Sequence, residues 1–184
     1  MAYFGISKPI IAKYNGETEK YSEAIELEAA GTSVTPAFSE GSFYCDNRLG
    51  IHRKLFKQAD ITAEIKTIPL AAGELLFGHT IDTSKKEETA KTNDKSNYVG
   101  YGFVGCEAID DERDVYTACW LPKVLFTEGE DSYTTQNDSI TFTAQKISGV
   151  AVGAKDKTWR EKAQFDTEDE AYSWLKTKAG IVAA

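Results

Sequence analysis

Apolar residues recur at every second position over much of this chain, and this spacing constrains the fold more than any other feature. Successive side chains of a β-strand point to opposite faces, so such alternation predicts a strand with one buried face. Residues 61–67 show it clearly, with Ile61, Ala63 and Ile65 on one side and polar residues between them. The chain is therefore predicted to be mainly β.

Several further segments are predicted to be strands, either from the same alternation or because they are rich in β-branched and aromatic residues. They are residues 24–30, 98–109, 115–126, 139–152 and 159–165. In the first of these, Ile25 and Leu27 are expected to face a core, and Glu26 and Glu28 to face away. The acidic segment 110–114 predicts a solvated hairpin turn, with adventitious cation binding as the alternative, and Gly149 predicts a bend or bulge.

Two short helices interrupt the strand pattern. The first is predicted over Leu70–Phe77 and ends at Gly78, a residue that commonly stops a helix. The second begins at Asp166 or Thr167, because Thr167 and Glu170 have the spacing of a capping box. Its apolar stripe comprises Ala171, Trp174 and Leu175, and Gly180 ends it. One apolar stripe predicts that this helix lies flat on a sheet.

Length and charge bound the domain organisation and the partners. With 184 residues the chain fits a single domain over residues 1–184. The net charge of -8 disfavours a nucleic-acid-binding protein, because such a protein needs Lys and Arg to displace phosphate counterions. A protein past which DNA slides would carry the same charge. The start of the chain does not resemble a signal peptide, and no apolar stretch is long enough to span a membrane as a helix.

Two segments do not fit a simple strand pattern. Residues 85–97 carry seven charged side chains, including Lys85, Lys86, Lys91 and Lys95, and are predicted to form a long solvated loop. The segment 41–59 mixes large apolar and basic residues, which makes it too apolar for a free loop and too basic for a core strand. Its members are Phe43, Tyr44, Leu49, Leu55 and Phe56 with Arg48, His52, Arg53, Lys54 and Lys57.

No motif in the sequence specifies catalysis, a metal or a cofactor. Gly100, Gly102 and Gly105 match the spacing G-x-G-x-x-G, but a dinucleotide site needs that motif to open a helix, and here the pattern stays extended. A strand whose glycines admit a neighbouring backbone or large rings is the favoured interpretation. His52 and His79 have no partner at ligand spacing, and the three cysteines are predicted to be reduced packing residues of a cytoplasmic chain. We expect no enzyme activity and no cofactor.

The order of these segments resembles the major tail proteins that form the tail tubes of long-tailed, non-contractile bacteriophages. The residues that carry the resemblance are Met1–Ile6, Phe43–Asn47, Leu75–Gly78, Tyr98–Val104, Lys123–Phe126, Thr134–Asn137, Ile140–Phe142, Ile147–Gly149, Phe165, Thr167–Ala171, Trp174 and Leu175. Together they cover nearly the whole chain. One departure is Cys45, where a small residue such as Ala would be expected.

The resemblance implies a β-sandwich or partly closed β-barrel with a flanking C-terminal helix, an α+β fold with little α. It implies hexameric rings that stack into a hollow tube for DNA ejection, in a virion protein made in the host cytoplasm. Its partners would be copies of itself and the tape-measure, terminator and initiator proteins, with no membrane and no stable DNA binding. Glu26 and Glu28 would then be candidates for an acidic lumen.

The resemblance also gives the unusual segments a role. In this family a long loop between early strands stacks on the next ring, and residues 41–59 occupy that place. The candidate contact residues there are Phe43, Tyr44, Arg48, Arg53, Lys54 and Phe56, and the second candidate segment is 85–97. The alternative hypothesis is a β-sandwich binding or adhesion module on a virion or bacterial surface, which would stay monomeric or form small oligomers.

Overall fold

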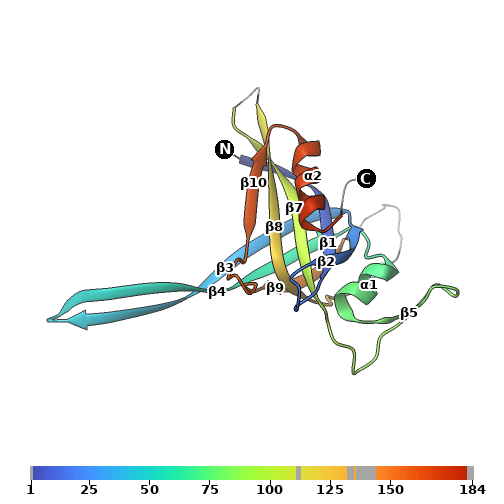
Figure 1. Cartoon of the computed structure of the whole chain (residues 1–184), viewed down its shortest axis with the longest axis horizontal. Helices are drawn as coiled ribbons and strands as arrows, with labels where there is room; N and C mark the ends of the chain where they lie inside the picture. Colours follow the sequence, from blue (N-terminus) through green and yellow to red (C-terminus); the bar gives the residue numbers. More distant parts are fainter. Residues whose placement is uncertain (1, 111–112, 132–134, 136–143, 182–184) are drawn as a thin grey trace.

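The computed structural model describes residues 2–110, 113–131, 135 and 144–181 (Figure 1). Its strands are β1 (Ala2–Tyr14), β2 (Tyr21–Glu26), β3 (Ala29–Cys45), β4 (Arg48–Ile65), β5 (Thr80–Asp82), β6 (Glu87–Thr89), β7 (Tyr98–Ala108), β8 (Asp114–Thr127), β9 (Gln145–Ala151) and β10 (Glu161–Phe165). Its helices are α1 (Leu70–Phe77) and α2 (Glu168–Lys178). The prediction of a mainly β fold with little α is confirmed.

Eight of these strands form one antiparallel sheet in the order β2-β1-β7-β8-β9-β4-β3, with β10 paired to β8 beside this path. The sheet curves around a core, but it is not a closed barrel, because β2 and β3 are its two ends. Strands β7 and β8 pair along almost their full length, which confirms the hairpin predicted around residues 110–114. Asp111 and Glu112 of that turn lie outside the described residues.

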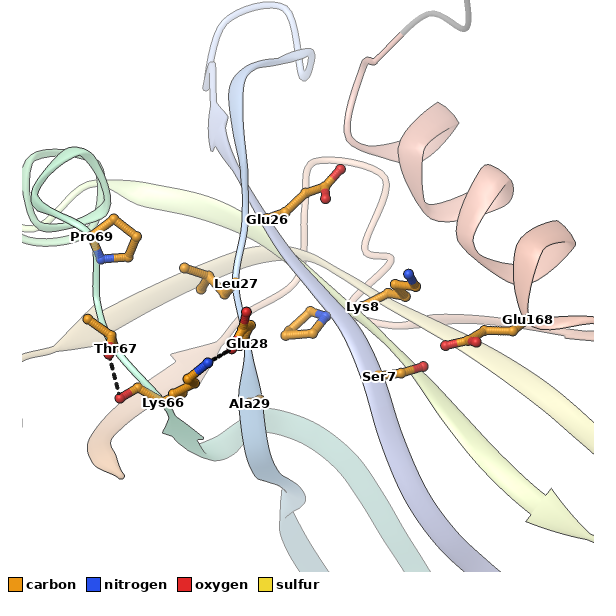
Figure 2. A pocket seen from close by; sticks show the side chains of 11 residues that line it. Ser7, Lys8, Glu26, Leu27, Glu28, Ala29, Lys66, Thr67, Pro69 and Glu168 are labelled. Atoms are coloured by element: carbon orange, nitrogen blue, oxygen red, sulfur yellow. Dashed lines mark hydrogen bonds and ion pairs between the residues drawn. The ribbon is translucent and has the colours of Figure 1, made fainter. Parts of the chain in front are cut away.

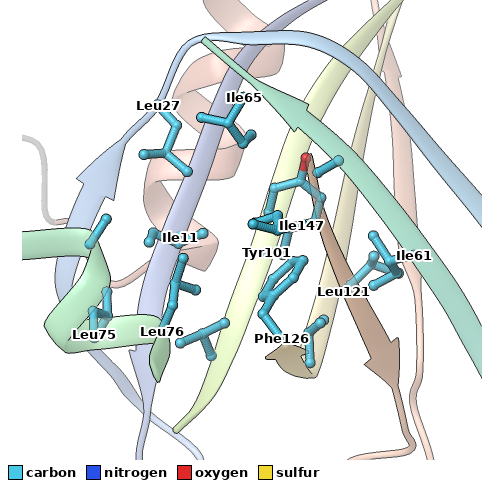
Figure 3. Close-up of a cluster of buried hydrophobic side chains, with 14 of the residues drawn as sticks. Ile11, Leu27, Ile61, Ile65, Leu75, Leu76, Tyr101, Leu121, Phe126 and Ile147 are labelled. Carbon is cyan, nitrogen blue, oxygen red and sulfur yellow. The ribbon is translucent and has the colours of Figure 1, made fainter. Parts of the chain in front are cut away.

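The larger hydrophobic core fills the concave side of the sheet (Figure 3). Ile11 of β1, Tyr101 of β7 and Phe126 of β8 face Ile61 and Ile65 of β4 across it, and all of these side chains are buried. Helix α1 packs against the same cluster through Leu75, Leu76 and Phe77. The alternation in residues 61–65 therefore corresponds to a strand with one buried face, as predicted.

A second core lies between the sheet and α2. Trp120 of β8 is 1% exposed and packs with Ala171 and Leu175 of the helix. A Cβ atom on Gly102 of β7 would lie 2.6 Å from the Trp120 ring and 2.8 Å from Leu175. The glycine-rich motif is thus a strand whose glycines make room for large side chains. This confirms its interpretation as a strand rather than a dinucleotide site.

Both helices follow the predicted boundaries. Helix α1 ends at Gly78, whose φ of 77° is left-handed and favours glycine. In α2, Thr167 is the N-cap residue, and its hydroxyl oxygen accepts a hydrogen bond from the Glu170 N–H at 3.3 Å. The Thr167 hydroxyl in turn donates to the Glu170 carboxylate at 3.0 Å, so the predicted cap forms, with the carboxylate bound to the Thr167 hydroxyl where a capping box would use the backbone N–H.

Two strand predictions need correction, and a third lies partly outside the described residues. Residues 24–30 are not one strand: β2 ends at Glu26 and β3 begins at Ala29, because the chain turns a corner there with Leu27 inserted in the core. Gly149 pairs in regular register within β9, and a Cβ there would lie 2.7 Å from the Phe126 ring, so the glycine accommodates that ring. The predicted strand 139–152 is described only from residue 144, where β9 follows.

The segment 85–97 is mostly exposed, as predicted, but part of it is a strand. Its residues Glu87–Thr89 form β6, which pairs with β5 in a small separate hairpin. The Glu88 carboxylate lies 2.7 Å from Nδ1 of the buried His79, and this contact attaches the hairpin to the body. In the part of the chain that the structure describes, no helix is long and apolar enough to cross a membrane.

Candidate docking arm

Residues 39–55 form a two-stranded projection that we call the arm. Strand β4 pairs with β9 over Ala59–Ile65, but beyond that point the described strands β3 and β4 pair with each other alone. Figure 1 shows the arm reaching far from the rest of the molecule. All of its residues are exposed. The prediction of a loop over residues 41–59 is therefore wrong, because the segment is mostly a β-hairpin.

The turn of this hairpin explains why the segment forms strands. Asp46 and Asn47 connect β3 to β4 and have φ angles of 47° and 60°. A two-residue turn with both φ angles positive matches the twist of antiparallel strands, and Asp and Asn tolerate that conformation better than most residues. The Asp-Asn pair between two apolar segments is the sequence signal from which this hairpin could have been predicted.

The arm has two chemically different faces, because residues paired across a hairpin share a face and successive residues alternate. Face A holds Phe38, Glu40, Ser42 and Tyr44 of β3 with their partners Phe56, Lys54, His52 and Leu49 of β4. Face B holds Ser39, Gly41, Phe43 and Cys45 with their partners Leu55, Arg53, Ile51 and Arg48.

The polar groups of face A are paired within the arm. The Lys54 ammonium lies 2.6 Å from the Glu40 carboxylate, and this hydrogen-bonded contact lowers the pKa of Glu40. Ser42 Oγ lies 2.9 Å from His52 Nδ1. Lys54, predicted as a contact residue, therefore already has an intramolecular partner.

Face B has the opposite character. Phe43, Ile51 and Leu55 are 61%, 55% and 66% exposed, and they lie among the arginines Arg48 and Arg53. Within the described residues neither arginine has an ion pair. Face B thus combines a large exposed apolar surface with two positive charges that form no ion pair in the described part of the chain.

The base of the arm is fixed to the body by aromatic stacking. The Phe56 ring lies on the Trp159 ring with centroids 4.5 Å apart and an interplanar angle of 14°. The Arg160 guanidinium also packs on this indole, 4.4 Å from the centroid of the Trp159 ring. Phe56, which we predicted as a contact residue, is half-buried and holds the arm in place.

Folding of the monomer alone does not explain why the chain forms this exposed arm. An isolated two-stranded hairpin is at best marginally stable in water, and it exposes unpaired backbone groups on both of its edges. Clusters of exposed large apolar side chains are typical of interaction surfaces. The arm therefore has the chemistry of a surface that another molecule covers.

The second predicted contact segment lies elsewhere. Lys85, Lys86, Lys91 and Lys95 are exposed near the β5–β6 hairpin, which lies on the far side of the body from the arm (Figure 1). Lys85 contacts Asp82 at 3.6 Å. The structure thus does not bring these lysines together with Phe43, Tyr44 and the arm arginines.

Glu26 and Glu28 border an open groove of about 720 Å³ between β1, the β2–β3 corner, the start of α1 and the first turn of α2 (Figure 2). Both side chains are exposed and Leu27 between them is buried, as predicted. Each carboxylate lies near a lysine: Glu28 is 2.5 Å from Lys66, and Glu26 is 4.0 Å from Lys176. The charge of this pair is therefore partly compensated.

The remaining chemical groups are dispersed. Among the described residues, no group of three or more His, Cys, Asp and Glu side chains could hold a metal ion. Cys45, Cys106 and Cys119 are all free thiols, and burial raises the pKa of Cys119 to about 11, which leaves it protonated at neutral pH.

Comparison with known proteins adds no family assignment. No protein-family model matches the chain, and a search of curated proteins returned no match. The geometry of the arm consequently carries the functional argument.

Proposed function

We propose that this protein is a structural subunit that assembles with copies of itself through the arm, in the manner of a phage tail-tube protein. The observation that carries the proposal is the arm: residues 39–55 are exposed on both faces and both edges. Folding of one chain buries none of its large side chains. Association with a second molecule would bury them and would contribute the hydrophobic stabilisation that the monomer lacks.

Charge distribution favours copies of the same chain as partners. The arm has three Lys and Arg residues against Glu40 and Asp46, and its face B carries two arginines and no carboxylate, whereas the whole chain has a net charge of -8. The rest of the molecule is therefore strongly acidic, and an acidic body attracts the basic arm of another copy. Because the arm and the body are different surfaces, their contact is heterologous, the kind that builds closed rings or open filaments.

The tail-tube form of the proposal comprises hexameric rings stacked into a hollow tube through which DNA is ejected, with tape-measure, terminator and initiator proteins as further partners. It rests on the ordered sequence resemblance together with the arm. Glu26 and Glu28 stay the candidates for the lumen surface, since both side chains are exposed and point away from the core.

The proposal is tested by concentrating the purified full-length protein and observing it by analytical ultracentrifugation and electron microscopy. We expect rings or hollow tubes, either spontaneously or after addition of an initiator complex. A protein that stays monomeric at high concentration and is absent from the tail tubes of virions would contradict the proposal.

The arm also suits the alternative of a binding or adhesion module, because an exposed aromatic hairpin could contact a different protein. The two functions differ in what happens to the pure protein. A binding module would stay monomeric or form small oligomers until its target is added, whereas a tube subunit would form large assemblies from one component.

A further inference from the structure

A second unpartnered surface lies beside α2. A groove of about 600 Å³ runs between this helix and the end of β10. Phe165 and Trp174 form its floor, with ring centroids 6.4 Å apart, and both rings are partly buried against the core beneath α2. The groove is thus a fixed aromatic surface that stays open to solvent on one side.

Carboxylates border this aromatic floor. Asp166, Asp169 and Glu170 line the groove, and within the described residues none of the three has an ion pair with a Lys or Arg. Glu170 contributes to the helix cap through Thr167. Asp166 and Asp169 have exposed side chains beside the rings. Carboxylates near a helix N-terminus stabilise the monomer through the helix dipole. This interaction does not explain why the two aromatic rings beside them are left open to solvent.

The groove and face B of the arm are complementary. Face B offers Phe43, Ile51 and Leu55 with two arginines, the groove offers two aromatic rings with carboxylates, and none of these charged groups forms an ion pair with another described residue. Lys178 already lies 5.2 Å from the Trp174 ring centroid, which shows that this ring can accept a cation. An arginine from the arm could therefore meet both the carboxylates and an aromatic ring.

The dimensions of the two surfaces also agree. Ile51 and Leu55 lie four residues apart on β4, which corresponds to about 13 Å along a strand. The groove residues of α2 extend from Asp169 to Thr177, which corresponds to about 12 Å along a helix. The apolar row of face B can accordingly lie along the floor of the groove.

The two surfaces cannot meet within one chain, because the arm projects away from the body that carries α2 (Figure 1). We infer that the groove between α2 and β10 receives face B of the arm of a second copy of this chain. This inference rests on the proposed function and deepens it, because it identifies which part of the body receives the arm. Each copy then has one arm to donate and one groove to offer, so the contact can repeat.

The test is a charge exchange in the full-length protein. The arm variant carries Arg48→Glu and Arg53→Glu, and the groove variant carries Asp166→Lys and Asp169→Lys. Each variant alone should raise the concentration needed for assembly at least tenfold. Combining all four substitutions in one chain should restore assembly, because the charges are again opposite.

Mixing the two variants gives a sharper result. The unchanged arm of the groove variant fits the unchanged groove of the arm variant, and the Glu-bearing arm of the arm variant fits the Lys-bearing groove of the groove variant, so the two variants can alternate in one assembly. We expect the mixture to form assemblies that contain both variants, at a concentration at which neither variant assembles alone. A matched control, Glu17→Lys with Glu74→Lys, changes the net charge by the same amount at exposed positions outside the groove and both candidate contact segments, and should assemble like the parent.

Lysines in the first turn of α2 could weaken the helix, so Asp166→Asn with Asp169→Asn is measured in parallel, with circular dichroism as the check of folding. This milder variant should also assemble less readily than the parent. A parent protein that assembles while both groove variants assemble equally well would overturn the groove assignment alone. A parent protein that never assembles would overturn the proposed function and the assignment with it.

Discussion

Large aromatic residues are buried in the body of this protein and exposed in its arm. In the body, Trp120 is 1% exposed and Tyr101 is 1% exposed, and each lies in a sheet with neighbouring strands on both sides. In the arm, Phe43 is 61% exposed and Tyr44 is 66% exposed, in a hairpin with no further described strand beside it. Folding of the monomer explains the first pair of aromatic residues and leaves the second pair without a function.

This difference separates two kinds of sequence constraint. Substitutions in the body should change the free energy of unfolding of a single molecule. Substitutions in the arm should leave that quantity nearly unchanged and alter association. An arm substitution that strongly lowers the free energy of unfolding of the monomer, or a core substitution that leaves it unchanged, would contradict this distinction.

The largest expected effect comes from paired truncations. Trp120→Ala removes a fully buried ring from the core beneath α2 and should lower the free energy of unfolding by about 3–5 kcal/mol. Phe43→Ala in the arm should change it by less than about 0.5 kcal/mol. Urea denaturation of dilute, monomeric protein measures both. A loss of several kcal/mol from Phe43→Ala would show that the arm is part of the folded core.

Alkaline pH offers a second comparison. Burial raises the pKa of Tyr101 to about 12, whereas a tyrosine in the unfolded chain ionises near pH 10. Between these values the unfolded chain has lost a proton that the folded protein retains. The stability contribution of Tyr101 is therefore complete below pH 10 and declines as pH rises, by roughly 2–3 kcal/mol at pH 12.

The measurement is the free energy of unfolding as a function of pH for the parent and for Tyr101→Phe. The variant loses the hydrogen bond to Thr32, so its stability is lower at neutral pH, but its alkaline decline should be shallower. Tyr44→Phe in the arm is the matched control, because that side chain stays in water, and its curve should run parallel to that of the parent. If the free energy of unfolding fell equally steeply with pH for Tyr101→Phe and the parent, the alkaline loss of stability could not be attributed to Tyr101.

Two Gly→Ala substitutions compare the packing of the core with that of the arm, because each adds one methyl group. Gly102→Ala would place a Cβ 2.6 Å from Trp120, which forces core side chains to shift and should cost about 1–3 kcal/mol of stability. Gly41→Ala in the arm meets no atom within 4 Å and should change stability by less than about 0.5 kcal/mol. Thermal unfolding of both variants checks this, and equal shifts in Tm would argue against the difference in packing.

The smallest effect on the monomer is expected within the arm itself. Arg53→Gln removes an unpaired charge from face B, and Lys54→Gln removes one partner of the Glu40 ion pair on face A. Neither substitution should shift Tm measurably, because exposed ion pairs contribute little. In sedimentation, however, Arg53→Gln should weaken association more than Lys54→Gln. The reverse order would assign docking to face A.

Much of the body could be predicted from the sequence. Ile61, Ala63 and Ile65 alternate with polar residues because one face of their strand is buried, and Thr167 with Glu170 marks the start of α2 through a local interaction. Both signals come from residues close together in the sequence. They predict a strand or a helix reliably where the local pattern agrees with the burial of the side chains. The corner at Leu27 could not be predicted, since it depends on where distant strands place the core.

The arm was recognised as unusual but was assigned the wrong structure. Its side chains have no core to face, so burial gave no pattern that distinguished a hairpin from a loop, and the turn at Asp46 and Asn47 was the remaining signal. The groove was not predicted, because Phe165 and Trp174 become neighbours only when β10 and α2 pack together. The sequence pattern predicts a capping role for Asp166 and Glu170 and no role for Asp169.

The central claim is that the arm is an element for association, and amide hydrogen exchange tests it most directly. In dilute monomer, residues 39–55 should exchange far faster than the paired amides of β7 and β8. In the concentrated, assembled protein, exchange should slow along the arm and over the groove residues of β10 and α2, and change little elsewhere in the body. An arm that is already protected in the monomer, or that still exchanges freely in the assembly, would contradict the account.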